Sequence, residues 1–296
     1  MLSLCTVCDK EYLLKGLAMH HSLCETIEGK WKLYWLCIDD DIYTELLRLN
    51  PKNVVPVRLA DLEKRDHALR RAKNNPASKY GTQYSQYCWT LTPYFINYLL
   101  KKYIAKGEKI IYADSDIYFY RSPQAISDMT GRHSVGIHSH YPFGGTRTET
   151  DNGWYNVGVL VITKNLAGIQ ISDHWKRWLM NPDNEYYATY GTCGDQKYLE
   201  LFEKIWGRDH VCVFDEEGGI SHLAPWNSDN QQHPEHKFIM HNGKAQSVAF
   251  FHFSHFRHDA ANDQWHDSLH GEWNPSKDVN IRRYYEEYFN VIKKVA

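Results

Sequence analysis

The sequence has no apolar run long enough to cross a bilayer, and no basic segment followed by an apolar core opens it. A spanning helix needs about 20 predominantly apolar residues, and a secretory signal needs an apolar core behind a charged start. We therefore expect a protein without a transmembrane segment. A cytoplasmic location fits, with peripheral attachment to a membrane left open.

Long blocks of lysine or arginine are also missing, and the formal net charge is only −2. Duplex nucleic acid is bound chiefly through neutralisation of its phosphates, which requires many basic side chains. The composition argues against nucleic acid as a partner, although it leaves room for a local anion site. It says nothing about the oligomeric state.

A disulfide framework is absent as well, because the seven cysteines are odd in number and scattered. Most lie in apolar runs: Cys5, Cys37, Cys88 and Cys212. Buried reduced thiols in a cytoplasmic protein fit this pattern better than a cross-linked secreted fold. Cys5 and Cys8 form a Cys-x-x-Cys pair, but no second pair lies nearby, which argues against a zinc site.

Aromatic residues, by contrast, are abundant. Tyrosine, tryptophan and phenylalanine make up 14% of the 296 residues, and 17 histidines accompany them. Tyrosine and tryptophan combine a flat apolar face with a polar group, which suits binding to sugar rings and nucleobases. Most of these side chains are expected to fill the core, but many lie in polar, loop-like segments.

The first third of the chain alternates short apolar runs with helical patterns. Apolar strands separated by helices are typical of an α/β fold, with one Rossmann-like, mainly parallel sheet flanked by helices. The expected strands are 2–7, 32–38, 54–59 and 109–112. The expected helices are 12–24, 42–49, 60–73 and 83–103.

The pattern is looser after Tyr120. The expected strands are 134–138, 154–163 and 211–214, with a glycine-rich loop at 143–146. The expected helices are 166–180, 195–205 and 279–295, the last closing the chain. Residues 237–256 predict a hairpin turning at Asn242-Gly243, which adds a smaller antiparallel element. No linker divides the chain, so 1–296 is expected to form a single domain.

Two pairs of aspartates follow apolar strands, Asp39 with Asp41 and Asp114 with Asp116. If the extended geometry continues, both members of a pair point to one face. Ligands gather beyond the carboxyl ends of strands in α/β sheets, and two carboxylates there suit Mn²⁺ or Mg²⁺ shared with nucleotide phosphates. The first pair precedes an expected helix, where capping is the better interpretation.

Five segments carry a further pattern: CTVCDKEYL (5–13), YADSDIYF (112–119), GWYNVGV (153–159), GDQKYL (194–199) and FFHFS (250–254). In this order they resemble motifs of nucleotide-diphospho-sugar glycosyltransferases of the GT-A fold. The resemblance is to bacterial enzymes distantly similar to the glycosyltransferase 8 group, and it covers most of the chain. It implies a nucleotide-binding half, 1–120, and an acceptor-binding half, 121–296.

The resemblance also implies roles for individual residues. The nucleotide would be bound by Thr6, Asp9, Tyr12, Asp114 and Ser115, with Asp9 bonding the base and Tyr12 stacking on it. The metal, Mn²⁺ or Mg²⁺, would be held by Asp114, Asp116 and His252. Asp195 and Gln196 would act beside the transferred sugar. The substrates would also contact Asn156, Trp226, Asn227, His255 and Arg257.

The residues alone leave a structural alternative open at several of these positions. Asp195 precedes an expected helix and could simply be its N-cap. Asn156 could be a buried amide bonded to backbone, and His252 could be a histidine of the core. Trp226 could stack on an acceptor sugar or be buried.

One part of the glycosyltransferase 8 pattern is missing. In that group a glycine and a lysine follow the metal-binding histidine and hold the diphosphate. Here the sequence HFSHFR (252–257) lacks both, so His255 or Arg257 would have to replace them.

The implied activity is a hexosyltransferase reaction from a nucleoside diphosphate sugar, UDP-linked by default, to a carbohydrate, as in surface polysaccharide or glycan synthesis. An inverting enzyme would use Asp195 as general base. A retaining one would use Asp195 or Gln196 to stabilise a cationic sugar, and the resemblance favours retention. A sugar-phosphate nucleotidyltransferase is the first alternative, but no glycine-rich phosphate loop follows the first strand. A non-catalytic carbohydrate-binding protein is the second, and it would not need Asp114 and Asp116.

Overall fold

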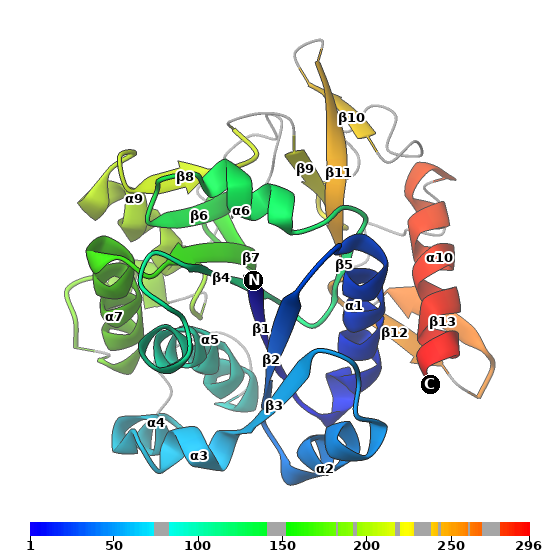
Figure 1. Cartoon of the computed structure of the whole chain (residues 1–296), viewed down its shortest axis with the longest axis horizontal. Coiled ribbons are helices and arrows are strands. Elements are labelled where there is room, and N and C mark those ends of the chain that lie inside the picture. The colour runs from blue at the N-terminus through cyan, green and yellow to red at the C-terminus, as the bar shows by residue number, and fades with distance from the viewer. Residues whose placement is uncertain are drawn as a thin grey trace.

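The large sheet of the computed structural model is assembled as the apolar runs predict. Its strands are β1 (Leu2–Cys8), β2 (Trp31–Cys37), β3 (Val54–Arg58), β4 (Lys109–Ala113), β6 (Val135–Ser139), β7 (Tyr155–Thr163) and β8 (Val211–Val213). They lie in the order β3-β2-β1-β4-β7-β6-β8 (Figure 1). Strand β7 is antiparallel to β4 and β6, and the other neighbours are parallel.

The structure describes residues 1–73, 83–140, 152–181, 183–191, 194–216, 220–227, 238–241, 244–259, 261–267 and 279–296. Two features predicted from the sequence, the glycine-rich loop at 143–146 and the Asn242-Gly243 turn, lie outside these residues. Within the described part of the chain, no helix combines the length and apolarity needed to cross a membrane.

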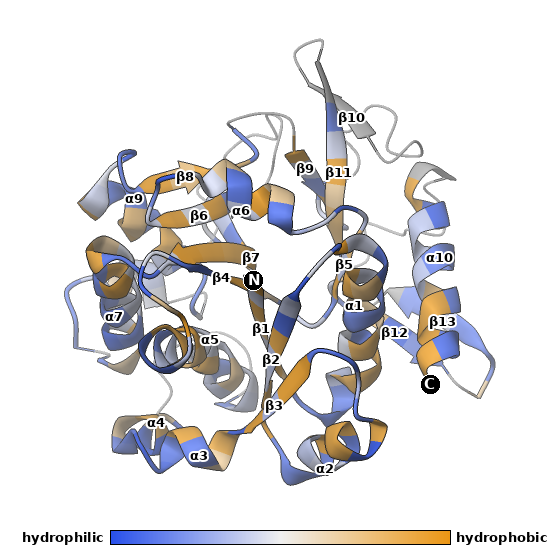
Figure 2. Ribbon diagram, in the orientation of Figure 1, coloured by the Kyte–Doolittle hydropathy of each residue, from blue (hydrophilic) through white to orange (hydrophobic). Residues whose placement is uncertain are grey.

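Helices cover both faces of the large sheet. On one face lie α1 (Leu13–Thr26), α2 (Asp40–Leu49) and α6 (Gln124–Thr130). On the other lie α3 (Leu59–Glu63), α4 (His67–Ala72), α5 (Gln83–Lys102), α7 (Leu166–Met180) and α9 (Glu200–Trp206). Because side chains alternate along a strand, Trp35 of β2 packs on the first face and Leu36 on the second. The strands are accordingly apolar along most of their length (Figure 2).

A smaller layer packs beside α1. It contains β5 (Ile117–Phe119), β9 (Ile220–Leu223), β10 (Phe238–His241) and β11 (Lys244–His252). The order is β10-β11-β5, antiparallel throughout, with β9 parallel to β11. The C-terminal helix α10 (Val279–Val295) closes this layer, and its Tyr288 ring stacks 3.9 Å from that of Phe253. A two-stranded sheet, β12 (Phe256–Asp259) with β13 (Gln264–Asp267), follows β11.

Two predicted helices differ from the structure, and some short strands were not predicted. The helix expected at 60–73 is two short helices, α3 and α4, because Asp66 interrupts it and caps α4 by accepting a hydrogen bond from Ala68 N at 3.1 Å. The helix expected at 195–205 starts with a 3-10 turn at Lys197–Leu199 before α9. Strands β5 and β9 were not predicted, since strands of three and four residues leave too short a pattern.

Candidate active site

The carboxyl ends of β1 and β4 mark the point where the order of the large sheet reverses. From β1 the chain moves outward through β2 and β3, then returns to place β4 on the other side of β1. The two strands are parallel, with Cys5 opposite Tyr112. Asp9 follows the first strand and Asp114 the second. Ligands of open α/β sheets bind at such a switch point.

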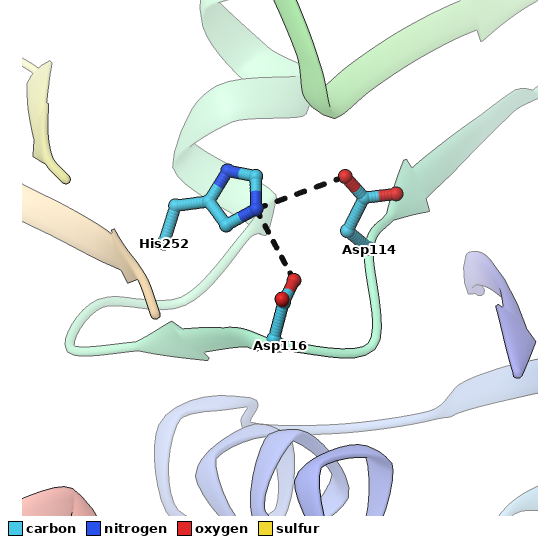
Figure 3. A group of neighbouring side chains, drawn as sticks. All are labelled: Asp114, Asp116 and His252. Atoms are coloured by element: carbon cyan, nitrogen blue, oxygen red, sulfur yellow. Dashed lines mark ion pairs between the residues drawn. The ribbon is translucent and has the colours of Figure 1, made fainter. Parts of the chain in front are cut away.

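Three metal-ligating side chains meet at this point, Asp114, Asp116 and His252 (Figure 3). Their nearest ligand atoms all lie within 4.8 Å of one another. His252 Nε2 is 3.2 Å from Asp116 Oδ1 and 3.9 Å from Asp114 Oδ2. Among the residues with a described placement, no other group of three or more such side chains is found.

Backbone pairing explains how residues so distant in sequence come together. The chain turns after β4, with Ile117 N bonded to Asp114 O at 3.1 Å, so the extended geometry expected through Asp116 does not persist. The turn leads into β5, and β11 runs antiparallel to β5 with His252 opposite Ile117. Phe253 N donates to Asp116 O at 2.9 Å. The pairing of β5 with β11 therefore completes the group of Asp114, Asp116 and His252.

The chemistry of the three side chains fits a divalent cation. Burial and the neighbouring charge of Asp116 raise the pKa of Asp114 to about 6, against the opposing effect of His252. Two carboxylates and an imidazole suit Mn²⁺ or Mg²⁺. The side chains of Asp116 and His252 are 9% exposed, but that of Asp114 is 32% exposed, which leaves one side of the triad open.

Asp116 has a second cationic neighbour that the sequence analysis missed, Lys15 of α1. Its Nζ lies 4.0 Å from Asp116 Oδ2, and both side chains are buried. Burial works to raise the pKa of Asp116, but His252 and Lys15 outweigh it and lower that pKa to about 2. The sequence held one signal for this placement. Residues three apart lie on the same face of a helix, so Lys15 lies on the same face as Tyr12, a residue predicted to bind the nucleotide.

Hydroxyl groups behind the triad connect Asp114 to Asp195. Tyr112, on β4, donates to Asp114 Oδ1 at 2.6 Å. Thr92 Oγ1, from α5, donates to the Tyr112 hydroxyl at 3.2 Å and also hydrogen-bonds the Asp195 carboxyl group. The four side chains come from three segments, because Tyr112 and Asp114 both lie at the end of β4, and Thr92, Tyr112 and Asp195 are buried. The two carboxyl groups therefore share one set of orienting contacts.

Tyr112→Phe is expected to weaken Mn²⁺ binding by about 10- to 100-fold, the usual effect of removing a group that orients a metal ligand. The ring and its packing remain, so the melting temperature should change little. Calorimetric titration of Mn²⁺ into the protein without donor measures the effect. Tyr34→Phe, on β2 of the same sheet, is the matched control. Equal Mn²⁺ affinity in the two variants would show that the contact does not orient Asp114.

The alternative that Asp195 is a helix N-cap does not hold. The helical segment begins at Lys197, with Gln196 in the N-cap position and no side-chain cap bond. Asp195 instead follows Gly194, whose φ is +60° and whose missing Cβ would lie 2.5 Å from the Trp89 ring. The pKa of Asp195 is raised well above 3.8, first by burial and then by Asp114. Burial and the charge of Asp114 thus both favour the protonated form of Asp195.

Gln196 and Asn156 bind each other. Asn156 Nδ2 donates to Gln196 Oε1 at 2.8 Å, and Gln196 Nε2 donates to Asn152 O at 2.7 Å. Asn156 Oδ1 accepts from Gly158 N at 2.8 Å. A Cβ on Gly158 would lie 2.7 Å from His252 Nδ1, so only glycine lets β7 come this close to His252. Asn156 is thus a satisfied buried amide beside the triad, and its contact with sugar stays a prediction.

The residues predicted to hold the nucleotide surround the end of β1. Asp9 Oδ1 accepts from Tyr12 N at 3.1 Å, and Asp9 Oδ2 accepts from the Tyr84 hydroxyl at 3.0 Å. Tyr12 is partly buried, and Lys15 Nζ lies 4.0 Å from its ring centroid. Thr6 is buried within β1, where its hydroxyl has no hydrogen-bond partner among the described residues.

Ser115 is also buried, in the turn between Asp114 and Asp116, and it hydrogen-bonds the thiol of Cys8. It therefore joins the ends of β1 and β4. The other aspartate pair is placed as predicted. Asp39 caps α2 by accepting from Ile42 N at 2.8 Å, and Asp41 bonds Lys10 at 2.8 Å.

The residues predicted to bind substrates separate into two groups. The Trp226 ring lies 5.2 Å from that of His252, and its Nε1 donates to His140 O at 3.0 Å. Asn227 is buried and accepts from Ala224 N at 2.8 Å, which holds the loop. His255 and Arg257 are exposed beyond the end of β11. The structure thus places Trp226 beside His252 of the triad and leaves His255 and Arg257 exposed.

The chain is similar in sequence to two uncharacterized proteins and in structure to several solved glycosyltransferases. The uncharacterized protein YfnF of Bacillus subtilis (strain 168) is 26% identical over 265 residues, which cover 86% of this chain and 81% of YfnF. The uncharacterized protein YfnD of the same organism is 25% identical over 257 residues, covering 85% and 76%. No family model matches the chain.

Among solved structures, the galactosyltransferase LgtC in complex with donor and acceptor sugar analogs has a TM-score of 0.59 at 15% identity, covering 99% of this chain and 96% of LgtC. Mouse xyloside xylosyltransferase 1 in its apo form has a TM-score of 0.54 at 15% identity, covering 86% and 97%. These similarities confirm the GT-A fold that the five motifs predict.

Proposed function

We propose that this protein is a metal-dependent glycosyltransferase. It transfers a sugar from a nucleoside diphosphate sugar, UDP-linked by default, to a carbohydrate acceptor, as in surface polysaccharide or glycan synthesis. The observation that carries the proposal is the Asp114–Asp116–His252 triad at the switch point of a GT-A fold. A lectin has no need of this triad, and a nucleotidyltransferase would show a glycine-rich loop after β1, where Asp9 and Tyr12 stand.

The triad would hold Mn²⁺ or Mg²⁺, and such a cation offsets the negative charge that develops on a departing diphosphate. Asp9 and Tyr12, placed beyond β1 on the nucleotide side, would bind the base, and Thr6 and Ser115 would lie beneath the nucleotide. Residues 1–120 would thus form the nucleotide-binding half of one domain, and 121–296 the acceptor-binding half.

The transferred sugar would lie between the triad and the buried carboxyl group of Asp195. Asp195 would stabilise positive charge on the sugar, while Gln196 and Asn156 hold the pocket wall through their mutual hydrogen bond. Trp226, beside His252, offers an aromatic face for the acceptor, and Asn227 fixes the loop that carries it. His255 and Arg257 would form the outer edge.

The proposal is tested by incubating the protein with a panel of nucleoside diphosphate sugars, with Mn²⁺ or Mg²⁺ and with EDTA. We expect one donor to raise the melting temperature only when metal is present, because a ligand bound by the native state alone stabilises it. We also expect that donor to release free nucleoside diphosphate. Release of pyrophosphate would instead identify a nucleotidyltransferase. Stabilisation by sugars without turnover would identify a binding protein.

A further inference from the structure

Lys15 lies between the two parts of the site that would hold a nucleotide. Its Nζ is 4.0 Å from the ring centroid of Tyr12, on the base side, and 4.0 Å from Asp116 Oδ2, on the metal side. The residue is 6% exposed. Burying a lysine ammonium is costly unless charges in the site compensate it. Asp116 supplies one compensating charge for Lys15.

The charges of the site do not balance until an anion is present. Asp114 and Asp116 carry two negative charges, which a divalent cation alone would neutralise. Lys15 then adds one positive charge next to the cation, while the charges of Arg257 and Asp9, which act on the pKa of Tyr12 in opposite directions, offset each other. A loaded metal site is consequently net positive. A diphosphate bridging from the base side to the metal would supply the missing negative charge.

A side chain that binds the diphosphate is needed here. The glycine and lysine that follow the metal-binding histidine in the glycosyltransferase 8 pattern are missing from HFSHFR (252–257). His255 and Arg257, the replacements expected from sequence, are exposed, whereas Lys15 is enclosed within the site. We propose that Lys15 binds the diphosphate of the donor, in the place of the lysine that this chain lacks. This inference rests on the proposed function and assigns the diphosphate a residue from α1, at the other end of the sequence.

The experiment compares wild type with Lys15→Met in two titrations. In the first, UDP, UMP and uridine are titrated calorimetrically with Mn²⁺ present. UDP should bind Lys15→Met about 10- to 100-fold more weakly, the loss expected for a hydrogen bond between charged groups. Uridine, which has no phosphate, should bind the two proteins about equally. Equal affinity for UDP would overturn the proposal.

The second titration uses Mn²⁺ alone and separates phosphate binding from a purely structural role. Removing a positive charge beside Asp116 should leave Mn²⁺ affinity unchanged or increase it, because the ammonium repels the cation. If Lys15 only positions Asp116, the variant should bind Mn²⁺ more weakly, and that result would overturn the proposal. Lys32→Met, an exposed lysine on β2, controls for net charge and should match wild type in both titrations.

Two further arms keep the outcomes distinct. If Lys15→Met does not fold, Lys15→Gln, which retains a polar group beside Asp116, carries the same two comparisons. GDP, ADP and CDP are included for wild type, and the comparison is made with the diphosphate that binds best and its monophosphate. Failure of wild type to bind any of the four diphosphates would refute the proposed function itself, whereas equal binding by the variant refutes only the role of Lys15.

Discussion

Asp116→Asn is expected to lower sugar transfer by about three orders of magnitude or more, the loss corresponding to several kcal/mol of charge stabilisation by a metal. Asparagine preserves the shape of a buried side chain, but it is a far weaker ligand. It also removes the charge that His252 and Lys15 share. Release of nucleoside diphosphate at saturating donor and Mn²⁺ measures the loss.

The same substitution should also destabilise the protein, by about 1–3 kcal/mol, because a buried lysine loses its counter-charge. The Asp116 carboxylate lies beside Lys15 and His252, and the backbone oxygen of Asp116 accepts from Phe253 N. Asp41→Asn is the matched control, since it changes the second residue of the other Asp-x-Asp pair. Asp41 is 70% exposed and should be replaceable without loss of activity. Comparable activity in both variants, or full activity in EDTA, would refute the metal site.

The parallel half of the fold could be predicted because its signals are local. Apolar runs such as 2–7 and 32–38 are buried on both faces, so each is a strand in nearly any context. The capping of α2 by Asp39 could be predicted for the same reason. An N-cap side chain bonds a backbone N–H only three residues further along the chain, here that of Ile42. The pair Asp114 and Asp116 could also be identified from the sequence, because it directly follows an apolar run that predicts a strand.

What could not be predicted depends on contacts between distant segments. Strand β5 exists because β11 pairs with it, and neither segment alone indicates this register. The role of Thr92 beside Asp195 requires α5 to cross behind β4, which no spacing in the sequence encodes. Lys15 looks like an ordinary helical lysine until α1 is placed against the turn of Asp116. Burial, which decides the charge state of each group, follows from this packing.

Asp195→Asn is expected to lower kcat by at least about 100-fold while leaving donor affinity nearly unchanged. Positive charge developing on the sugar would favour the ionised form of Asp195, and the attraction between the two is felt mainly in the transition state. The substitution keeps the shape of the side chain and its contact with Thr92. The main chain stays fixed too, since Trp175 Nε1 donates to Asp195 O at 2.9 Å. Steady-state kinetics with varied donor separate kcat from KM.

Stability should change in the opposite direction. The pKa of Asp195 is raised well above 3.8, so the folded state binds its proton more tightly than the unfolded state does. Linkage then makes this group's contribution most favourable at low pH, and the contribution is lost as the pH rises through the folded-state pKa. Asparagine avoids that loss. Asp195→Asn should therefore melt higher than wild type at pH 7, and the gain should vanish as the pH falls towards 3.8.

Asp215→Asn distinguishes a loss of catalysis from the removal of any buried carboxyl group. Asp215 is 5% exposed, and burial raises its pKa to about 6 although Ser139 N donates to it. It lies outside the triad, so its replacement should bring a similar gain in melting temperature with normal turnover. A slower but more stable Asp195→Asn, beside a fully active Asp215→Asn, would assign the charge of Asp195 to the reaction. Near wild-type turnover by Asp195→Asn would leave it a purely structural residue, because the amide preserves every contact except the charge.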